Sequence, residues 1–217
     1  MGEIAYTVRR SDRARRVRVS VSHDAEVEVV LPRRAAQREA AAAIRELRPW
    51  IERRLEDALR TRAALWRPPG TAPYLGALLR VCPEPGRSRV HRRGGELLVP
   101  AGDHREALER WYRRAARTEI EPRVEAATAR LGTAHSSLSI RGQRTRWGSC
   151  SHSGALSFNW KLLLAPEPVL DYVVWHEVCH LEVMDHSRRF WRLLERQVPD
   201  CDEHARWLRR YGSALAL

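Results

Sequence analysis

The sequence is poor in cysteine and has no long apolar run. It contains only Cys82, Cys150, Cys179 and Cys201 and no C-x-x-C pair, so it offers no disulfide framework, and free thiols are expected. No stretch reaches the roughly 18 consecutive apolar residues of a transmembrane helix. The N-terminus also lacks the apolar segment of a signal peptide. We therefore expect a cytoplasmic protein without a membrane partner.

Lysine is almost absent as well, because Lys161 is the only one. Arginine therefore carries nearly all of the positive charge in a chain whose formal net charge is +12. Base composition and solvated helix faces account for such a surplus. Attraction to nucleic acid or another polyanion is the functional alternative, and it would weaken as salt rises. No contiguous basic tract with interleaved aromatic residues decides between these interpretations, so both stay open.

Two histidines one helical turn apart form the chemical centre of the sequence. The segment His176-Glu177-Val178-Cys179-His180 reads H-E-x-x-H within an apolar stretch. On a helix, positions i and i+4 share one face, so both imidazoles can point at one cation while Glu177 reaches a water on it. Zinc suits this set, and it lowers the pKa of a bound water to about 7. A glutamate in an apolar helix is costly to bury, which favours a functional role.

A third histidine, His186, follows His180 by six residues. On a continuous helix this spacing would turn its side chain by about 600° and carry it about 9 Å along the axis, away from the cation. The helix must therefore end near residue 183 or 184, and Asp185 or Ser187 can cap a new helix from Arg188. With that break, His186 is the expected third zinc ligand. Later helices carry the rival third ligands Glu195, Glu203 and His204.

Hydrophobic spacing and turn residues give the order of the secondary structure. A small antiparallel sheet is expected first, then a helical region in which Pro49 either breaks one helix or opens a second. Short strands and a long helix with Asp103 as N-cap follow, and three more strands precede the motif helix. The expected ranges are 4–32, 35–66, 74–99, 103–131, 136–140, 145–150, 155–158 and 166–183, with closing helices at 188–197 and 202–211.

Two blocks of the sequence carry a family resemblance. In the first, the H-E-x-x-H segment is followed by His186, Ser187 and the pair Phe190-Trp191. The second block begins at Arg144, runs on through 145–151 and continues at 156–160. Together they resemble the YgjP-like metallopeptidases, relatives of the SprT-like zincins. The resemblance is strong over residues 136–208 and weaker upstream.

The resemblance implies an α+β fold with a zincin-like core, made of a small antiparallel sheet, the H-E-x-x-H helix and the helices after it. We assign this core to residues 102–217 and a β-rich and helical extension to residues 1–101. An extended peptide would lie along an edge strand formed by residues 156–159. The predicted substrate-binding residues are Arg146, Trp147, Phe158 and Asn159. The predicted zinc ligands and general base are His176, His180, His186 and Glu177.

The favoured function is a zinc metallopeptidase that cleaves peptide bonds in proteins or peptides. Members of the resembling family also carry labels as nucleotide (UTP-type) pyrophosphatases. The lack of a Walker A loop or a dinucleotide fingerprint counts only mildly against that alternative, since Arg141, Arg144 and Arg146 offer cations for phosphates. A DNA-associated protein with structural zinc is the third hypothesis. Three protein ligands speak against it, because structural zinc sites usually close all four positions.

Overall fold

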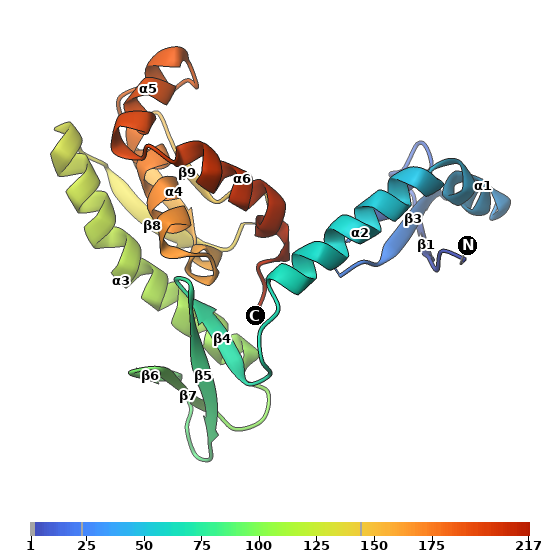
Figure 1. Ribbon diagram of the computed structural model, residues 1–217, viewed down its shortest axis with the longest axis horizontal. Helices are drawn as coiled ribbons and strands as arrows, with labels where there is room; N and C mark the ends of the chain where they lie inside the picture. Colours follow the sequence, from blue (N-terminus) through green and yellow to red (C-terminus); the bar gives the residue numbers. More distant parts are fainter. Residues whose placement is uncertain (1–2, 23, 144) are drawn as a thin grey trace. The chain divides into compact units, whose positions relative to one another are not determined.

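The computed structural model describes residues 3–22, 24–143 and 145–217 (Figure 1). Arg144 lies outside the described residues. This arginine begins the second block of the family resemblance and is one of the candidate cations for binding phosphates. The chain separates into two compact units, Met1–Trp66 and Arg67–Leu217, which are described in turn. These units are defined by their compactness, which does not show that either folds by itself. The predicted domain boundary between residues 101 and 102 therefore stays a prediction.

The first unit begins with a three-stranded sheet of β1 (Thr7–Ser11), β2 (Arg18–Val21) and β3 (Val27–Pro32), in the order β1-β3-β2. Pairing between β2 and β3 is antiparallel, but β1 pairs with β3 in parallel. The expectation of an antiparallel sheet is therefore wrong for that pair. The strand richest in buried valine and leucine, β3, takes the central position between the other two.

Two helices complete this unit, α1 (Arg38–Glu46) and α2 (Arg48–Ala64). Pro49 lies in the first turn of α2, where its missing N–H leaves no hydrogen bond unmade. This confirms the second of the two predicted roles for that proline. Ala40, Ile44 and Ile51 pack with the buried side chains of β3 into one apolar cluster, so the helices bury the sheet's inner face.

The second unit opens with a four-stranded sheet. Its strands are β4 (Thr71–Tyr74), β5 (Ala77–Glu84), β6 (His91–Arg93) and β7 (Glu96–Pro100), in the order β4-β5-β7-β6. The backbone N–H of Leu75 donates to the carbonyl oxygen of Leu163 at 2.8 Å. The hydroxyl of Tyr112 donates to the carbonyl oxygen of Pro73. These strands, expected within the N-terminal extension, are therefore tied to the unit that carries the motif helix.

The long helix α3 (Arg105–Leu131) supports the rest of this unit. Its buried stripe includes Tyr112, Ile120 and Val124, and it ends at Gly132, whose φ of 66° lies in the left-handed region that favours glycine. Asp103 lies one position before the N-cap, and its carboxylate accepts from the backbone N–H of Arg105 at 3.1 Å. The helix therefore begins slightly later than predicted, but the same aspartate satisfies its first turn.

A second small sheet precedes the motif helix. It contains β8 (Ser137–Arg141), β9 (Gly148–Cys150) and β10 (Ala155–Asn159), in the order β8-β10-β9. Pairing of β10 is parallel with β8 and antiparallel with β9, so the expected antiparallel core sheet is in fact mixed. The prediction that residues 156–159 form an edge strand is also wrong. The buried side chains of Leu156 and Phe158 are consistent with the central place of β10, and β8 and β9 form the two edges.

The chain then continues through a short 3₁₀ turn (Trp160–Leu164) into helices α4 (Glu167–Cys179), α5 (Arg188–Gln197) and α6 (Cys201–Tyr211). Helix α4 contacts α3, α5, α6 and β9, which makes it the central helix of the unit (Figure 1). The described part of the chain is thus a mixed α+β structure with three small sheets and six α-helices. None of these helices has both the length and the apolar character needed to cross a membrane.

Candidate metal centre

The buried helix α4 carries the first two histidines. Val173, Val174 and Val178 are almost fully buried, which anchors the helix between α3 and the sheet. The helix ends at Cys179, with His180 at its C-cap, a few residues earlier than predicted. Backbone N–H groups of residues 181–183 then donate to Val178 and Cys179 in tight turns that redirect the chain. A new helix begins at Arg188, as predicted.

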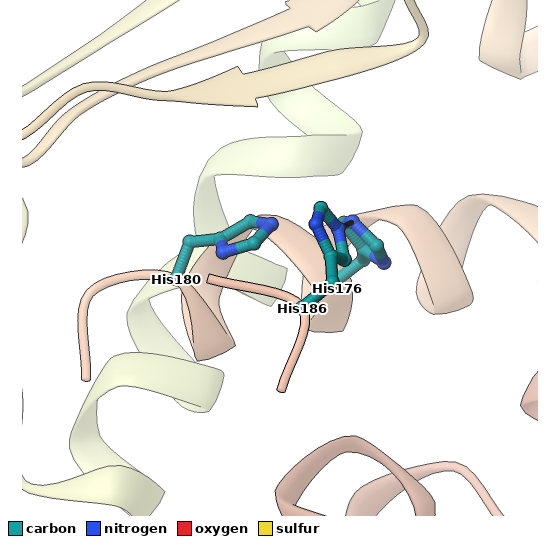
Figure 2. Close-up of side chains that lie close together, drawn as sticks. All are labelled: His176, His180 and His186. Atoms are coloured by element: carbon teal, nitrogen blue, oxygen red, sulfur yellow. Dashed lines mark hydrogen bonds between the residues drawn. The ribbon is translucent and has the colours of Figure 1, made fainter. Parts of the chain in front are cut away.

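This reversal brings three imidazoles together (Figure 2). His176, His180 and His186 each offer a ring nitrogen, and these atoms all lie within 4.8 Å of one another. The Nε2 atoms of His176 and His186 are 3.1 Å apart. Two nitrogens bound tetrahedrally to zinc at 2.0–2.1 Å would be separated by roughly 3.3 Å. The spacing of these donors therefore fits a zinc ion.

The ring of His180 is fixed by the turn that follows it. Its Nδ1 lies 3.0 Å from the carbonyl oxygen of Val183, so Nδ1 carries the proton and donates it. Nε2 is then left with its lone pair, the form in which an imidazole binds a metal. The buried Nδ1 of His176 has no hydrogen-bond partner among the described residues. The centre thus contains one oriented imidazole and one whose second nitrogen is unsatisfied.

Phe190, in the first turn of α5, packs against the three imidazoles. Its ring is fully buried and stacks on His180 at 4.4 Å between centroids, with 23° between the planes. The same ring meets His176 at 4.9 Å and His186 at 4.8 Å with its edge. One aromatic side chain therefore packs against all three imidazoles. The sequence placed Phe190 only in a family pattern, and no local spacing rule signals this contact, because His186 precedes the helix that carries Phe190.

Burial sets the charge of the imidazoles. Burial, together with repulsion from the neighbouring His180 and His186, lowers the pKa of His176 to about 4. Burial also lowers the pKa of His180. Both rings are therefore neutral at pH 7, and neutral imidazole is the form that coordinates a metal without first losing a proton.

Glu177 is buried beside the cluster, with only 6% of its surface exposed. Burial raises the pKa of this carboxyl to about 7, and the positive charge of Arg146 opposes the shift. A carboxyl whose pKa lies near 7 can both accept and return a proton at neutral pH. Glu177 thus has the electrostatic character of a general base.

Gly148 on β9 is a functional candidate that the sequence reasoning missed. A Cβ placed on it would lie 2.5 Å from Cγ and 2.6 Å from Oε1 of Glu177. Its φ is not in the left-handed region, so the lack of space explains the glycine and the backbone conformation does not. A glycine within a short strand signals such a close approach of another group.

The four predicted substrate-binding residues occupy two kinds of environment. Arg146 is exposed, and it lines an open hollow together with half-buried Trp147. Phe158 is fully buried. The side-chain amide of Asn159 donates to the carbonyl oxygens of Gln143 and Arg146 at 2.8 and 3.1 Å, which holds the loop before β9. The contacts of Phe158 and Asn159 are those of supporting residues, and a direct binding role for them stays a prediction.

Within the described ranges, the group of side chains able to hold a metal consists of the three histidines. The rival third ligands Glu195, Glu203 and His204 lie outside it. The ring of His204 instead lies beside that of Tyr172, with 6.2 Å between ring centroids. The ring of Tyr172 in turn lies 5.9 Å from that of His176, again between centroids. Of the third ligands considered from the sequence, the geometry therefore favours His186.

A mixed α+β unit with three convergent histidines on and after one helix defines a candidate metalloprotein. The sequence matches the family described as YgjP-like, metallopeptidase domain, over residues 15–211, and the chain belongs to that family. Membership supports a zinc metallopeptidase in general terms and implies a metal ion and peptide substrates. None of the curated proteins matches the sequence.

Two solved structures resemble part of the chain. One is the metallopeptidase zymogen abylysin of Pyrococcus abyssi, at 26% identity and a TM-score of 0.38, covering 41% of this chain and 91% of that one. The other is the metallopeptidase zymogen jannalysin of Methanocaldococcus jannaschii, at 22% identity and a TM-score of 0.37, covering 41% of this chain and 92% of that one.

Proposed function

We propose that the chain is a zinc-dependent peptidase of the H-E-x-x-H type, with a zincin-like core. His176, His180 and His186 hold the metal, and Glu177 is the general base. The observation that carries this proposal is the convergence of three imidazole nitrogens within 4.8 Å, beside a buried glutamate, in a chain of a metallopeptidase family. Three protein ligands leave a coordination position open, which is typical of catalytic and not structural zinc.

Glu177 performs the proton transfers in this mechanism. When bound, zinc supplies Lewis acidity, which polarises a peptide carbonyl and lowers the pKa of a water to about 7. Glu177 would take a proton from a water as the water oxygen attacks the peptide carbonyl carbon, and would return that proton to the amine nitrogen as the C–N bond breaks. Burial raises the pKa of this carboxyl, which makes it a stronger base than an exposed glutamate. Phe190 and the carbonyl oxygen of Val183 hold the imidazoles in place.

The substrate backbone is assigned to the free edge of β9. The carbonyl oxygen of Trp147 and the N–H of Ser151 point toward β10, where they bond to Asn159 and Ala155. Backbone groups alternate in direction along an antiparallel strand, so those of Gly148 and Cys150 face the free edge. An extended peptide added there gains main-chain hydrogen bonds with little demand on its sequence. This replaces the strand of residues 156–159 that the sequence suggested.

The test compares the zinc-loaded protein with its Glu177→Gln variant on an unfolded protein and, separately, on nucleoside triphosphates. Glutamine keeps the size of the side chain but cannot act as the base, so proteolysis should fall by at least a hundredfold, within the range of general-base catalysis. Glu182→Gln is the matched control, since Glu182 pairs with Arg189 at 3.6 Å and should leave the rate unchanged. Triphosphate cleavage that depends on Glu177, without proteolysis, would replace the peptidase by the pyrophosphatase alternative.

A further inference from the structure

A polar hollow of about 610 Å³ lies in the second unit, at the end of the ladder between β9 and β10. Among the described residues, four cationic side chains line it: Arg113, Arg146, Lys161 and Arg209. Glu109 also lines the hollow and accepts from Arg113 at 2.7 Å, which neutralises that cation. No carboxylate in the described ranges lies within ion-pair distance of the other three. The hollow therefore has a net positive charge.

The walls of this hollow are shaped by two glycines. A Cβ on Gly142 would lie 2.6 Å from Nη2 of Arg113 and 3.1 Å from Nε1 of Trp160. A Cβ on Gly212 would lie 2.7 Å from Cζ2 of Trp147. Neither glycine has a left-handed φ, so backbone conformation does not require glycine there. A neighbouring side chain instead occupies the space that a Cβ would need. The side chains of Arg113, Trp147 and Trp160 thus pack closely against these two glycines.

Two residues that line the hollow, Arg146 and Trp147, lead directly into the strand edge beside Glu177. Arg146 and Trp147 directly precede Gly148, which pairs with Phe158 across the ladder and touches Glu177. An extended chain advances about 3.3 Å per residue. A peptide paired with β9 across from Gly148 would therefore bring a side chain to the hollow one to three residues away from the bond beside Glu177.

We propose that this hollow is a specificity subsite that binds a carboxylate of the peptide substrate through Arg146, Lys161 and Arg209. The carboxylate comes from an aspartate or glutamate side chain, or from the C-terminus of the peptide. The proposal rests on the proposed peptidase function for its choice of a peptide as occupant. The cations, the carboxylate-poor lining and the position of Arg146 and Trp147 directly before β9 make acidic peptides the preferred substrates.

The test measures cleavage of peptides with both ends blocked that carry aspartate, or asparagine in its place, at each position near the cleaved bond. A second arm compares free C-terminal acids with their amides. Hydrogen bonds to charged groups predict about a tenfold to hundredfold preference in kcat/KM for the carboxylate in one of the two arms. Lys161→Met and Arg209→Met should each reduce this ratio severalfold, and salt should reduce it as well. Arg206→Met, an exposed arginine on the same helix as Arg209, should leave the ratio unchanged.

A binding measurement separates failure of the subsite from failure of the proposed function. Fluorescently labelled peptides are titrated with zinc-loaded Glu177→Gln protein, and anisotropy reports their affinity. Carboxylate-dependent binding that weakens in Lys161→Met would support the subsite even if no peptide is cleaved. Cleavage without any preference for carboxylates in either arm would overturn the subsite and leave the peptidase intact. Tighter binding of a short oligothymidylate through Lys161 and Arg209 would make the hollow a nucleic-acid site and also overturn the proposal.

Discussion

Replacing Gly148 by alanine puts a methyl group against the proposed general base. The new Cβ would lie 2.5 Å from Cγ, 2.6 Å from Oε1 and 2.8 Å from Cδ of Glu177. Ordinary carbon–carbon contact begins at about 3.5 Å, so either Glu177 or β9 must move by roughly 1 Å. Glu177 is buried and cannot swing into solvent, and β9 is held to β10 by its ladder. The displacement therefore falls on the catalytic geometry.

The expected magnitude follows from this displacement. A misplacement of about 1 Å at a reacting group costs roughly a hundredfold in rate. Overpacking of a tight site costs about 1–3 kcal/mol of stability. Gly148→Ala should therefore bind zinc with the three histidines as before, unfold at a moderately lower temperature and cleave peptides about a hundredfold more slowly.

The assay determines kcat on an unfolded protein, zinc content by elemental analysis and Tm by calorimetry. Gly95→Ala is the matched control, because no atom lies within 4 Å of a Cβ at that position and its φ is not left-handed. It should leave all three quantities unchanged. Wild-type kcat in Gly148→Ala, with zinc and fold intact, would refute the assigned contact between β9 and Glu177 as a determinant of catalysis.

Three further predictions concern the metal, its packing and the surface charge. Alanine at His176 or His180 should abolish zinc binding, and alanine at His186 should weaken it by orders of magnitude. Elemental analysis that finds full zinc occupancy in His186→Ala would show that another residue is the third ligand. Phe190→Ala removes the buried ring beneath the three imidazoles and should cost about 3–5 kcal/mol in denaturant unfolding, whereas Phe190→Leu should lose less. If the arginine surplus serves nucleic acid, gel-shift affinity for DNA should fall steeply between low and physiological salt, and the absence of a shift even at low salt would leave the charge without that role.

The histidine cluster was accessible from the sequence because it depends on local chain geometry. Spacing of four residues on one helix places His176 and His180 together, and the six-residue interval to His186 requires a break that the structure contains. The helix ends at Cys179, earlier than predicted. The N–H groups of residues 181–183 donate to the carbonyl oxygens of Val178 and Cys179 in tight turns, and these turns replace the expected last turn of the helix. Local rules thus predicted that the three histidines converge and misplaced only the end of the helix.

The sheet and the contacts across it were not accessible in the same way. Alternation of apolar residues identifies β10 as a strand but does not say which strands flank it, so its central position was missed. Gly148 and Glu177 are 29 positions apart in the sequence, and their contact depends on how β9 packs on α4. The same holds for β1, whose parallel pairing with β3 is not specified by the local alternation of apolar residues. Strand order, strand direction and the contact between Gly148 and Glu177 all depend on long-range packing. The local pattern of apolar residues carries no information about such packing.

The central claim is that His176, His180 and His186 together hold a catalytic zinc. X-ray absorption at the zinc edge of the metal-loaded protein tests it most directly. We predict one zinc per chain, with three imidazole nitrogens at about 2.0–2.1 Å and one further light ligand, and loss of one imidazole in His186→Ala. Sulfur at about 2.3 Å, or a protein that binds no zinc at all, would contradict the claim.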